Sequence, residues 1–377
     1  PLHVPLAELL ESVETLATHV RQNRPRERDH ALARRHPSLP SLPTVAPPGT
    51  PDAVPMNALD AAMVAIADAN PRLRIRVANP DELRSNRMGA TLERLKHRAV
   101  DPEPGAPEAI DGAVITALNE EAVVCAALAN KGGLNLVVSY EAFAVKMLGA
   151  IRQELIFARH LREAGRPPEW LSVPVVLTAH TWENGKNEQS HQDPTLCEGL
   201  LAEMSDTSRV LFPADWHTAI ACLHACYRTR GSIWTLVVPK RPVPQHFDAA
   251  AAARLVRDGA VRLRGHGGAD EQLVLTAIGA YQLGEVLRAS DALREAAVPH
   301  AVNYLLEPGR FRIARDASEA GVLAPAVRDA LYPTSAQARV FVTHTRPEPM
   351  LGVLRPLDTG PARTRVLGFV NRGGTLD

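Results

Sequence analysis

This chain has few aromatic residues, few lysines and few cysteines, and it has no net charge. Aromatic residues make up 4% of its 377 residues, and the formal net charge at pH 7 is zero. Proteins that bind nucleic acid or a membrane surface usually carry a basic excess, so neither kind of partner is expected. No stretch of eighteen apolar residues occurs, and no charged N-terminal region precedes an apolar one. These absences predict a cytoplasmic protein.

The spacing of the few cysteines argues against a metal site, and the scarcity of lysine makes individual lysines candidates for functional residues. None of the four cysteines forms a Cys-x-x-Cys pair, and Cys222 and Cys226 have the spacing of one helix face. We expect reduced, mostly buried thiols and no metal site. Arginine outnumbers lysine 37 to 5. Lys186 and Lys240 therefore stand where a compact ammonium group is favoured over a guanidinium.

Helical and strand patterns alternate along most of the chain. The alternation predicts the α/β class, with two doubly wound domains whose sheets are mostly parallel. An N-terminal helix and a Pro-rich, extended linker are expected over 1–55, a first domain over 56–250 and a smaller one over 251–377. Helices are expected at 6–22, 58–69, 141–160, 193–204, 216–228, 281–297 and 318–330, a strand or turn leading into a helix at 113–129, and strands at 73–77, 134–138, 173–178, 209–212, 232–238, 273–278, 301–305 and 339–343.

One segment is dense in polar side chains. Residues 180–194 read HTWENGKNEQSHQDP and directly follow the apolar run Val173–Val176. Loops at the ends of strands are where α/β enzymes carry their functional groups, and histidine titrates near neutral pH. This loop is therefore the first candidate for an active site.

The same loop resembles the substrate loop of phosphoketolases, which are thiamine-diphosphate enzymes related to transketolase. Its Ser-His-Gln-Asp-Pro sequence carries the resemblance. Three further segments resemble that family in the same order: Asn79–Arg87 (NPDELRSNR), Ser139–Phe143 (SYEAF) and Val238–Gln245 (VPKRPVPQ). The resemblance implies a transketolase-type pyrimidine-binding domain followed by the family's C-terminal domain.

The resemblance also implies a partner chain. In this family Mg²⁺ and the cofactor diphosphate are held by a Gly-Asp-Gly…Asn motif on a preceding domain, and no Gly-Asp-Gly occurs here. The chain is expected to hold the pyrimidine half of thiamine diphosphate, with Mg²⁺ on a second chain. Self-dimerisation would then give an α2β2 complex. Alternatively the sequence is a fragment of a longer chain, because it begins at Pro1.

Four residues are expected at the cofactor. Glu120 matches the glutamate that faces N1′ of the aminopyrimidine, with Glu121 as the alternative, although acidic residues also favour helix N-termini for electrostatic reasons. Phe143 matches the aromatic ring that stacks on the pyrimidine. Tyr140 is expected nearer the reacting centre or the phosphate. Glu82 matches a carboxylate that links the two active sites of a dimer.

The resemblance gives the substrate side a second set of residues. His191 is expected to move protons to and from substrate hydroxyl groups, and Lys240 to neutralise a sugar phosphate. Lys186 replaces a family histidine, and Glu188-Gln189 replace a Gly-Phe pair, which indicates a different donor or acceptor. The remaining expected substrate contacts are Ser85, Asn187, Ser190 and Gln192.

These features predict a subunit of a split phosphoketolase-like enzyme. It would cleave the C2–C3 bond of a ketose, or of a ketose phosphate, and form a two-carbon acetyl or ketol adduct. Two alternatives stay open. One is a transketolase-like two-subunit ketol transferase, and the other is a non-catalytic interaction or regulatory protein of the same fold.

Overall fold

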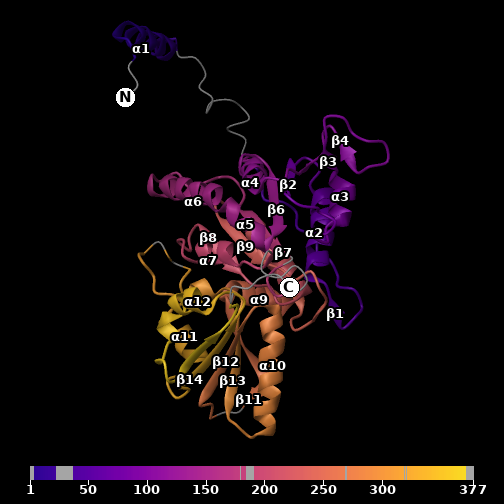
Figure 1. Ribbon diagram of the computed structural model, residues 1–377, viewed down its shortest axis with the longest axis vertical. Helices are drawn as coiled ribbons and strands as arrows, with labels where there is room; N and C mark the ends of the chain where they lie inside the picture. The colour runs from indigo at the N-terminus through magenta and orange to yellow at the C-terminus, as the bar shows by residue number, and fades with distance from the viewer. Residues whose placement is uncertain are drawn as a thin grey trace, which may run out of the picture.

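A computed structural model describes residues 4–22, 37–178, 180–183, 191–267, 270–317, 319 and 321–370. Two β-sheets with helices around them make up most of this part (Figure 1). The smaller sheet lies below the larger one in this view, and α10 (Ala280–Glu295) runs along its side. None of the described helices has the length and apolar character needed to span a membrane.

The larger sheet has eight strands in the order β4-β3-β5-β2-β6-β7-β9-β8, and every neighbouring pair is parallel. β7 is buried at every position, as expected for a strand whose sheet is covered on both faces. The bounds are β2 Ile75–Ala78, β3 His97–Arg98, β4 Glu108–Ala109, β5 Val114–Ile115, β6 Leu134–Tyr140, β7 Val173–Thr178, β8 Ser208–Leu211 and β9 Ile233–Val237.

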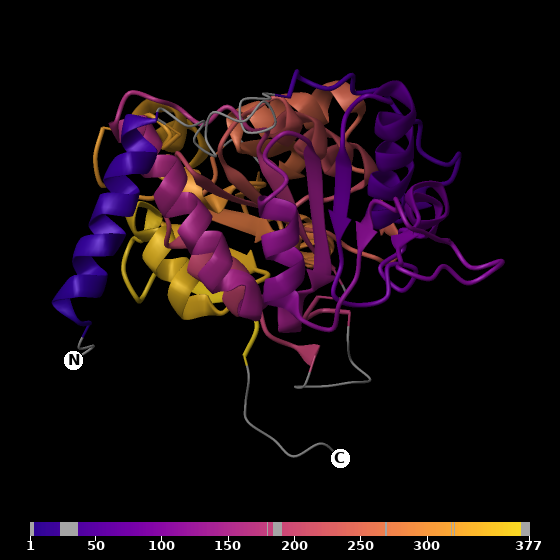
Figure 2. The same cartoon turned by 90° about the horizontal axis from the view of Figure 1, so that it is seen from above.

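Helices cover both faces of this sheet, as the view from above shows (Figure 2). One apolar core contains Met63, Trp216 and Leu255, and the other contains Val124, Ile151 and Leu200. The first core includes α2 (Pro55–Ala69), α8 (Trp216–Tyr227) and α9 (Ala249–Asp258), and α3 (Gly89–Leu95) packs on α2; the second includes α4 (Glu120–Leu128), α6 (Leu148–Glu163) and α7 (Thr195–Leu201).

The smaller sheet has five strands in the order β11-β13-β12-β14-β15. Only β11 is antiparallel to its neighbour. The predicted α/β class with mostly parallel sheets is therefore confirmed, while the domain boundaries at 55 and 250 stay predictions. The bounds are β11 Ala260–Gly267, β12 Leu273–Ile278, β13 His300–Leu305, β14 Ala338–Thr343, β15 Thr364–Leu367, α11 Pro325–Leu331 and α12 Pro347–Val353.

Two described segments lie before α2. α1 (Leu6–Arg21) has no buried residue and stands apart from the two sheets in Figure 1. Residues 37–51 form neither helix nor strand, and the short β1 (Asp52–Ala53) pairs with β10 (Val243–Pro244). The Pro-rich segment thus contains no helix, which proline disfavours.

Some expected elements differ from those found. The single helix expected at 141–160 is divided into α5 (Glu141–Ala144), a 3-10 turn (Val145–Met147) and α6. The helix expected from residue 318 starts only at Pro325, and proline is favoured at the first position of a helix. Glu319 does not belong to the helix because it accepts a hydrogen bond from the Arg315 backbone in the preceding loop. The sequence pattern did not predict α9, β11 or β15.

Buried polar contacts join the two sheets. The guanidinium of Arg209 on β8 donates to the Glu307 carboxylate, just after β13, at 2.8 Å. Tyr304 donates its hydroxyl proton to the carbonyl oxygen of Phe212. The side chain of Glu307 is 4% exposed and that of Arg209 is 23% exposed. The two sheets are therefore connected by polar contacts that are largely buried.

Glu307→Ala should lower the free energy of unfolding by about 3 kcal/mol, because it leaves the Arg209 guanidinium unpaired in a mostly buried position. Urea denaturation measures this change. The control is Asp329→Ala, which removes an exposed pair with Arg328 and should cost less than about 1 kcal/mol. Equal losses for the two variants would contradict the prediction.

Candidate active site

The candidate site lies at the carboxyl ends of four neighbouring strands. β2, β6, β7 and β9 are adjacent and parallel, so the segments that follow them meet at one edge of the sheet. Ligands of open α/β sheets bind at this edge. The three segments Asn79–Arg87, Ser139–Phe143 and Val238–Gln245 all lie there, together with the start of the predicted loop.

Glu120 is buried at the first position of α4, whereas Glu121 is exposed. Asn119 caps the helix, and its side-chain oxygen accepts the Ala122 N–H at 2.8 Å. Lys146 Nζ lies 3.0 Å from Glu120 Oε1. Of the two candidate glutamates, Glu120 thus has the position for a buried site.

Phe143 lies at the centre of the expected cofactor residues. Lys146 Nζ is 5.3 Å from the centre of its ring, and the His191 ring meets it edge-on at 5.0 Å. The ring of Tyr140 lies 6.2 Å away. Glu120, Phe143, Tyr140 and His191 are therefore brought together, with Lys146 between Glu120 and Phe143.

Tyr140 connects this group to the expected substrate residues. Its hydroxyl lies 2.6 Å from Ser85 Oγ, and Lys240 Nζ lies 4.8 Å from the centre of its ring. Its backbone N–H donates to Asp81 at 3.2 Å. Burial raises the pKa of Asp81, and the nearby charge of Glu120 acts in the same direction. Two carboxylates and two lysines thus surround the aromatic pair.

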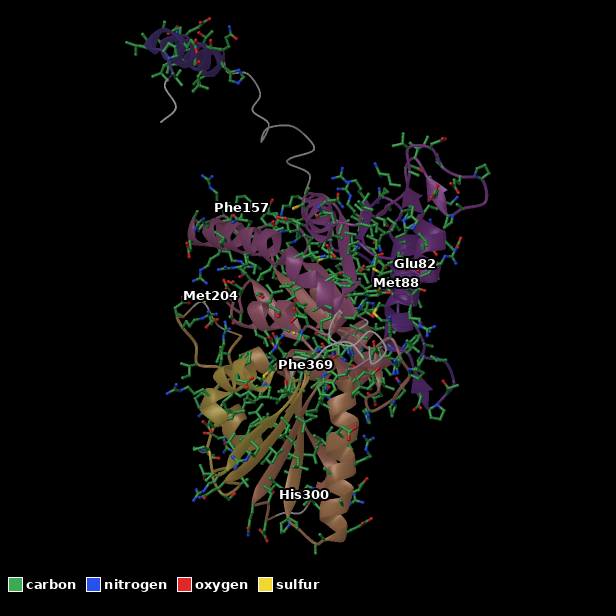
Figure 3. All side chains as sticks on the ribbon, viewed as in Figure 1. Glu82, Met88, Phe157, Met204, His300 and Phe369 are labelled. Carbon is green, nitrogen blue, oxygen red and sulfur yellow. The ribbon has the colours of Figure 1, made fainter. Side chains whose placement is uncertain are left out.

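The other expected residues have mixed outcomes. Gln192 donates to the Thr181 carbonyl oxygen at 3.3 Å, so it supports the start of the loop. Glu82 is exposed on the same side of the molecule as Met88 (Figure 3), and its backbone carbonyl accepts from Ser85 Oγ. Lys186, Asn187 and Ser190 lie outside the described residues.

Sequence reasoning missed a fully buried carboxylate, Glu141. Its Oε1 accepts from His344 Nε2 at 2.7 Å, and its Oε2 accepts from the backbone and hydroxyl of Thr181 at 2.8 and 2.9 Å. Burial alone would raise the pKa of Glu141, but the His344 imidazole outweighs it and holds the pKa below the usual range. Glu141 therefore connects His344, which directly follows β14 of the smaller sheet, to the beginning of the candidate loop.

Glu141, His180 and His344 form a group that could hold a metal ion. One possible ligand atom from each residue lies within 4.8 Å of the other two. The His180 and His344 rings meet edge-on at 4.8 Å. Burial lowers the pKa of His180 to about 3, so its ring is neutral at pH 7. A direct hydrogen bond joins Glu141 and His344, whereas the buried Nδ1 of His180 has no hydrogen-bond partner among the residues that the structure describes.

A second missed carboxylate, Glu183, accepts from the Lys240 backbone at 2.7 Å and from the Tyr281 hydroxyl at 2.6 Å. Glu141 and Glu183 lie within the segments 139–143 and 180–194 that the sequence singled out, but the roles of these carboxylates depend on contacts with His344 and Tyr281, which are distant in the sequence. Lys146 did have a signal. It is one of only five lysines, and scarcity had already singled out Lys186 and Lys240.

Comparison with known proteins finds phosphoketolases among the relatives of this chain. A family profile described as "XFP: D-xylulose 5-phosphate/D-fructose 6-phosphate phosphoketolase" matches residues 57–229. A probable phosphoketolase from Mycobacterium avium is 29% identical over 317 residues, which are 80% of this chain and 38% of that protein. The chain thus spans well under half the length of this curated relative.

Solved structures share the fold. Transketolase from Campylobacter jejuni aligns with a TM-score of 0.64 and 13% identity, over 98% of this chain and 51% of that one. A structure titled "Split gene transketolase, inactive beta4 tetramer" aligns with a TM-score of 0.52 and 15% identity, over 84% of this chain and 88% of that one. The expected resemblance to phosphoketolases is therefore confirmed over residues 57–229, the solved structures show that the chain has the transketolase fold, and the matches cover only part of the phosphoketolase's length.

Proposed function

We propose that this chain is one subunit of a split phosphoketolase-like enzyme that cleaves the C2–C3 bond of a ketose and yields a two-carbon acetyl or ketol unit. A second chain would carry the diphosphate-binding domain and Mg²⁺. The observation that carries the proposal is the grouping of Glu120, Phe143 and His191 at the carboxyl edge of the large sheet. The split-gene transketolase neighbour, of which this chain covers 88%, supports a partner.

The site residues fit an aminopyrimidine ring. Such a ring needs a flat apolar surface and a hydrogen-bonding carboxyl group at its nitrogen edge. Phe143 is half-buried and offers the surface, and the Glu120 carboxylate, 10% exposed, offers the acid. Lys146 contacts both groups, but its side chain is 60% exposed and can turn into solvent. The ring would then take the place of the lysine ammonium group.

Each residue then has a defined task. Thiamine diphosphate, when bound, supplies the electron sink for carbon–carbon bond cleavage. Glu120 holds a proton at N1′ of the aminopyrimidine, and Phe143 orients the ring by stacking. His191 moves a proton at a substrate hydroxyl group. Tyr140 and Ser85, joined by their hydroxyl groups, position the substrate.

The remaining expected contacts belong to the substrate side or to the assembly. Lys240, next to Tyr140, would bind oxygen atoms of the substrate, and Gln192 would hold the loop. We propose the same substrate role for Lys186, Asn187 and Ser190 on their sequence match. Glu82, exposed on this chain, would face a second copy in a self-dimer, giving α2β2 in the cytoplasm.

A transketolase-like ketol transferase is the second candidate, and the split-gene transketolase neighbour favours it. The two reactions differ in what receives the two-carbon unit. Adding a ketose with inorganic phosphate to the reconstituted complex gives acetyl phosphate in the first case. Adding a ketose with an aldehyde gives a longer ketose in the second. Isotope tracing of the two-carbon unit separates them.

Glu120→Gln should reduce turnover of the reconstituted complex by about a hundredfold or more, since acid–base groups contribute 10²–10⁴-fold. The matched control is Glu121→Gln on the same helix turn, which should stay within about twofold of wild type. Steady-state rates and melting temperatures measure the two variants. Unchanged turnover for Glu120→Gln would remove the catalytic role that we propose for this residue.

Lys146→Ala should strengthen thiamine diphosphate binding by up to about fivefold, because the ring no longer displaces a largely exposed ion pair worth at most about 1 kcal/mol. Calorimetric titration of the complex measures the dissociation constant. Lys131→Ala, which removes another lysine–glutamate pair outside the site, serves as the control. Weaker binding by Lys146→Ala would instead make the lysine a cofactor contact.

A further inference from the structure

The turn after β9 forms a cradle for an anion, and a side chain of the protein fills it. The backbone N–H groups of Lys240 and Arg241 both donate to Glu183 Oε1, at 2.7 and 3.2 Å. The Tyr281 hydroxyl donates to the same oxygen at 2.6 Å. Successive backbone N–H groups aimed at one point are a general way of binding anions such as phosphate. Here the anion is the carboxylate of Glu183.

Positive side chains surround the cradle. Lys240 interacts electrostatically with Arg87 and Arg241 as well as with Glu183. Burial lowers the pKa of Lys240, and the attraction of Glu183 opposes this shift. The Arg241 guanidinium also donates to the backbone carbonyl oxygen of Glu183 at 2.5 Å. Glu183 therefore neutralises a group of cations that would otherwise be available to an external anion.

Glu183 is held tightly, and one of its oxygens is unused. The residue is 2% exposed, and Oε2 has no hydrogen-bond partner in the part of the chain that the structure describes. Burial raises the pKa of this carboxyl group, while the hydrogen bond from Tyr281 acts against that. A buried, unpaired polar atom calls for an explanation such as a functional role. Its neighbour Lys240 lies 4.8 Å from the Tyr140 ring in the candidate site.

We propose that Glu183 is a specificity-determining residue that occupies the place of a substrate phosphate, so that the donor is a ketose without a phosphate group at this end. The proposal rests on the proposed function of the site. A phosphate group entering here would lose the backbone donors to Glu183 and would meet a like charge. Lys240 then binds hydroxyl groups of the sugar rather than a phosphate.

Inorganic phosphate is the direct probe of the cradle. Calorimetric titration of the full chain, in phosphate-free buffer at fixed ionic strength, compares wild type with Glu183→Ala and with Glu271→Ala. The control removes another buried carboxylate, which pairs with Arg262 in the smaller sheet. Glu183→Ala should bind phosphate at least tenfold more tightly than both other proteins. Equal affinity in wild type, or no gain in a folded Glu183→Ala protein, overturns the proposal.

A second measurement does not use Glu183→Ala, so it tests the proposal even if that variant does not fold. The reconstituted wild-type enzyme is given D-xylulose and D-xylulose 5-phosphate separately. The account expects kcat/KM to be at least tenfold higher for the unphosphorylated sugar, and a preference for the phosphate ester overturns it. If the enzyme turns over neither sugar, the proposed function is contradicted. The role of Glu183 is then tested by measuring the affinity of wild type and of Glu183→Gln for inorganic phosphate. The glutamine keeps the cradle filled, so tight binding by both proteins overturns the proposal.

Discussion

The buried carboxylate of Glu141 connects three parts of the molecule. It lies just after β6, accepts a hydrogen bond from His344 of the smaller sheet, and accepts two more from Thr181 at the start of the candidate loop. A charge removed from water in this way is stable only when it is paired and fully hydrogen-bonded. The geometry of the site therefore depends on both sheets, although the expected cofactor residues come from one of them.

This arrangement explains why residues of the smaller sheet reach the site. Trp182 donates to the His344 carbonyl oxygen at 2.9 Å, and Tyr281, near the start of α10, donates to Glu183. The first residues of the loop are thus held from the side of the smaller sheet. Glu120 and Phe143, which are expected to bind the cofactor, belong to helices that pack on the larger sheet.

The alternation of helices and strands was readable from the sequence because buried parallel strands such as Val173–Thr178 are continuous apolar runs. Glu120, Phe143 and His191 were found through motif resemblance, and their proximity follows from the parallel order of the strands. Glu141 and Glu183 were not found, because their partners His344 and Tyr281 are distant in sequence. The start of α11 was placed too early, since periodicity does not show that Glu319 binds arginines in the preceding loop.

The central claim is that this chain binds the aminopyrimidine of its cofactor between Glu120 and Phe143. A crystal structure of the chain with its partner and thiamine diphosphate measures this directly. The account predicts that a Glu120 oxygen lies within hydrogen-bonding distance of N1′, about 2.6–3.0 Å, that the pyrimidine stacks on Phe143, and that Lys146 has moved away. A pyrimidine bound elsewhere, with Lys146 still paired to Glu120, would contradict it.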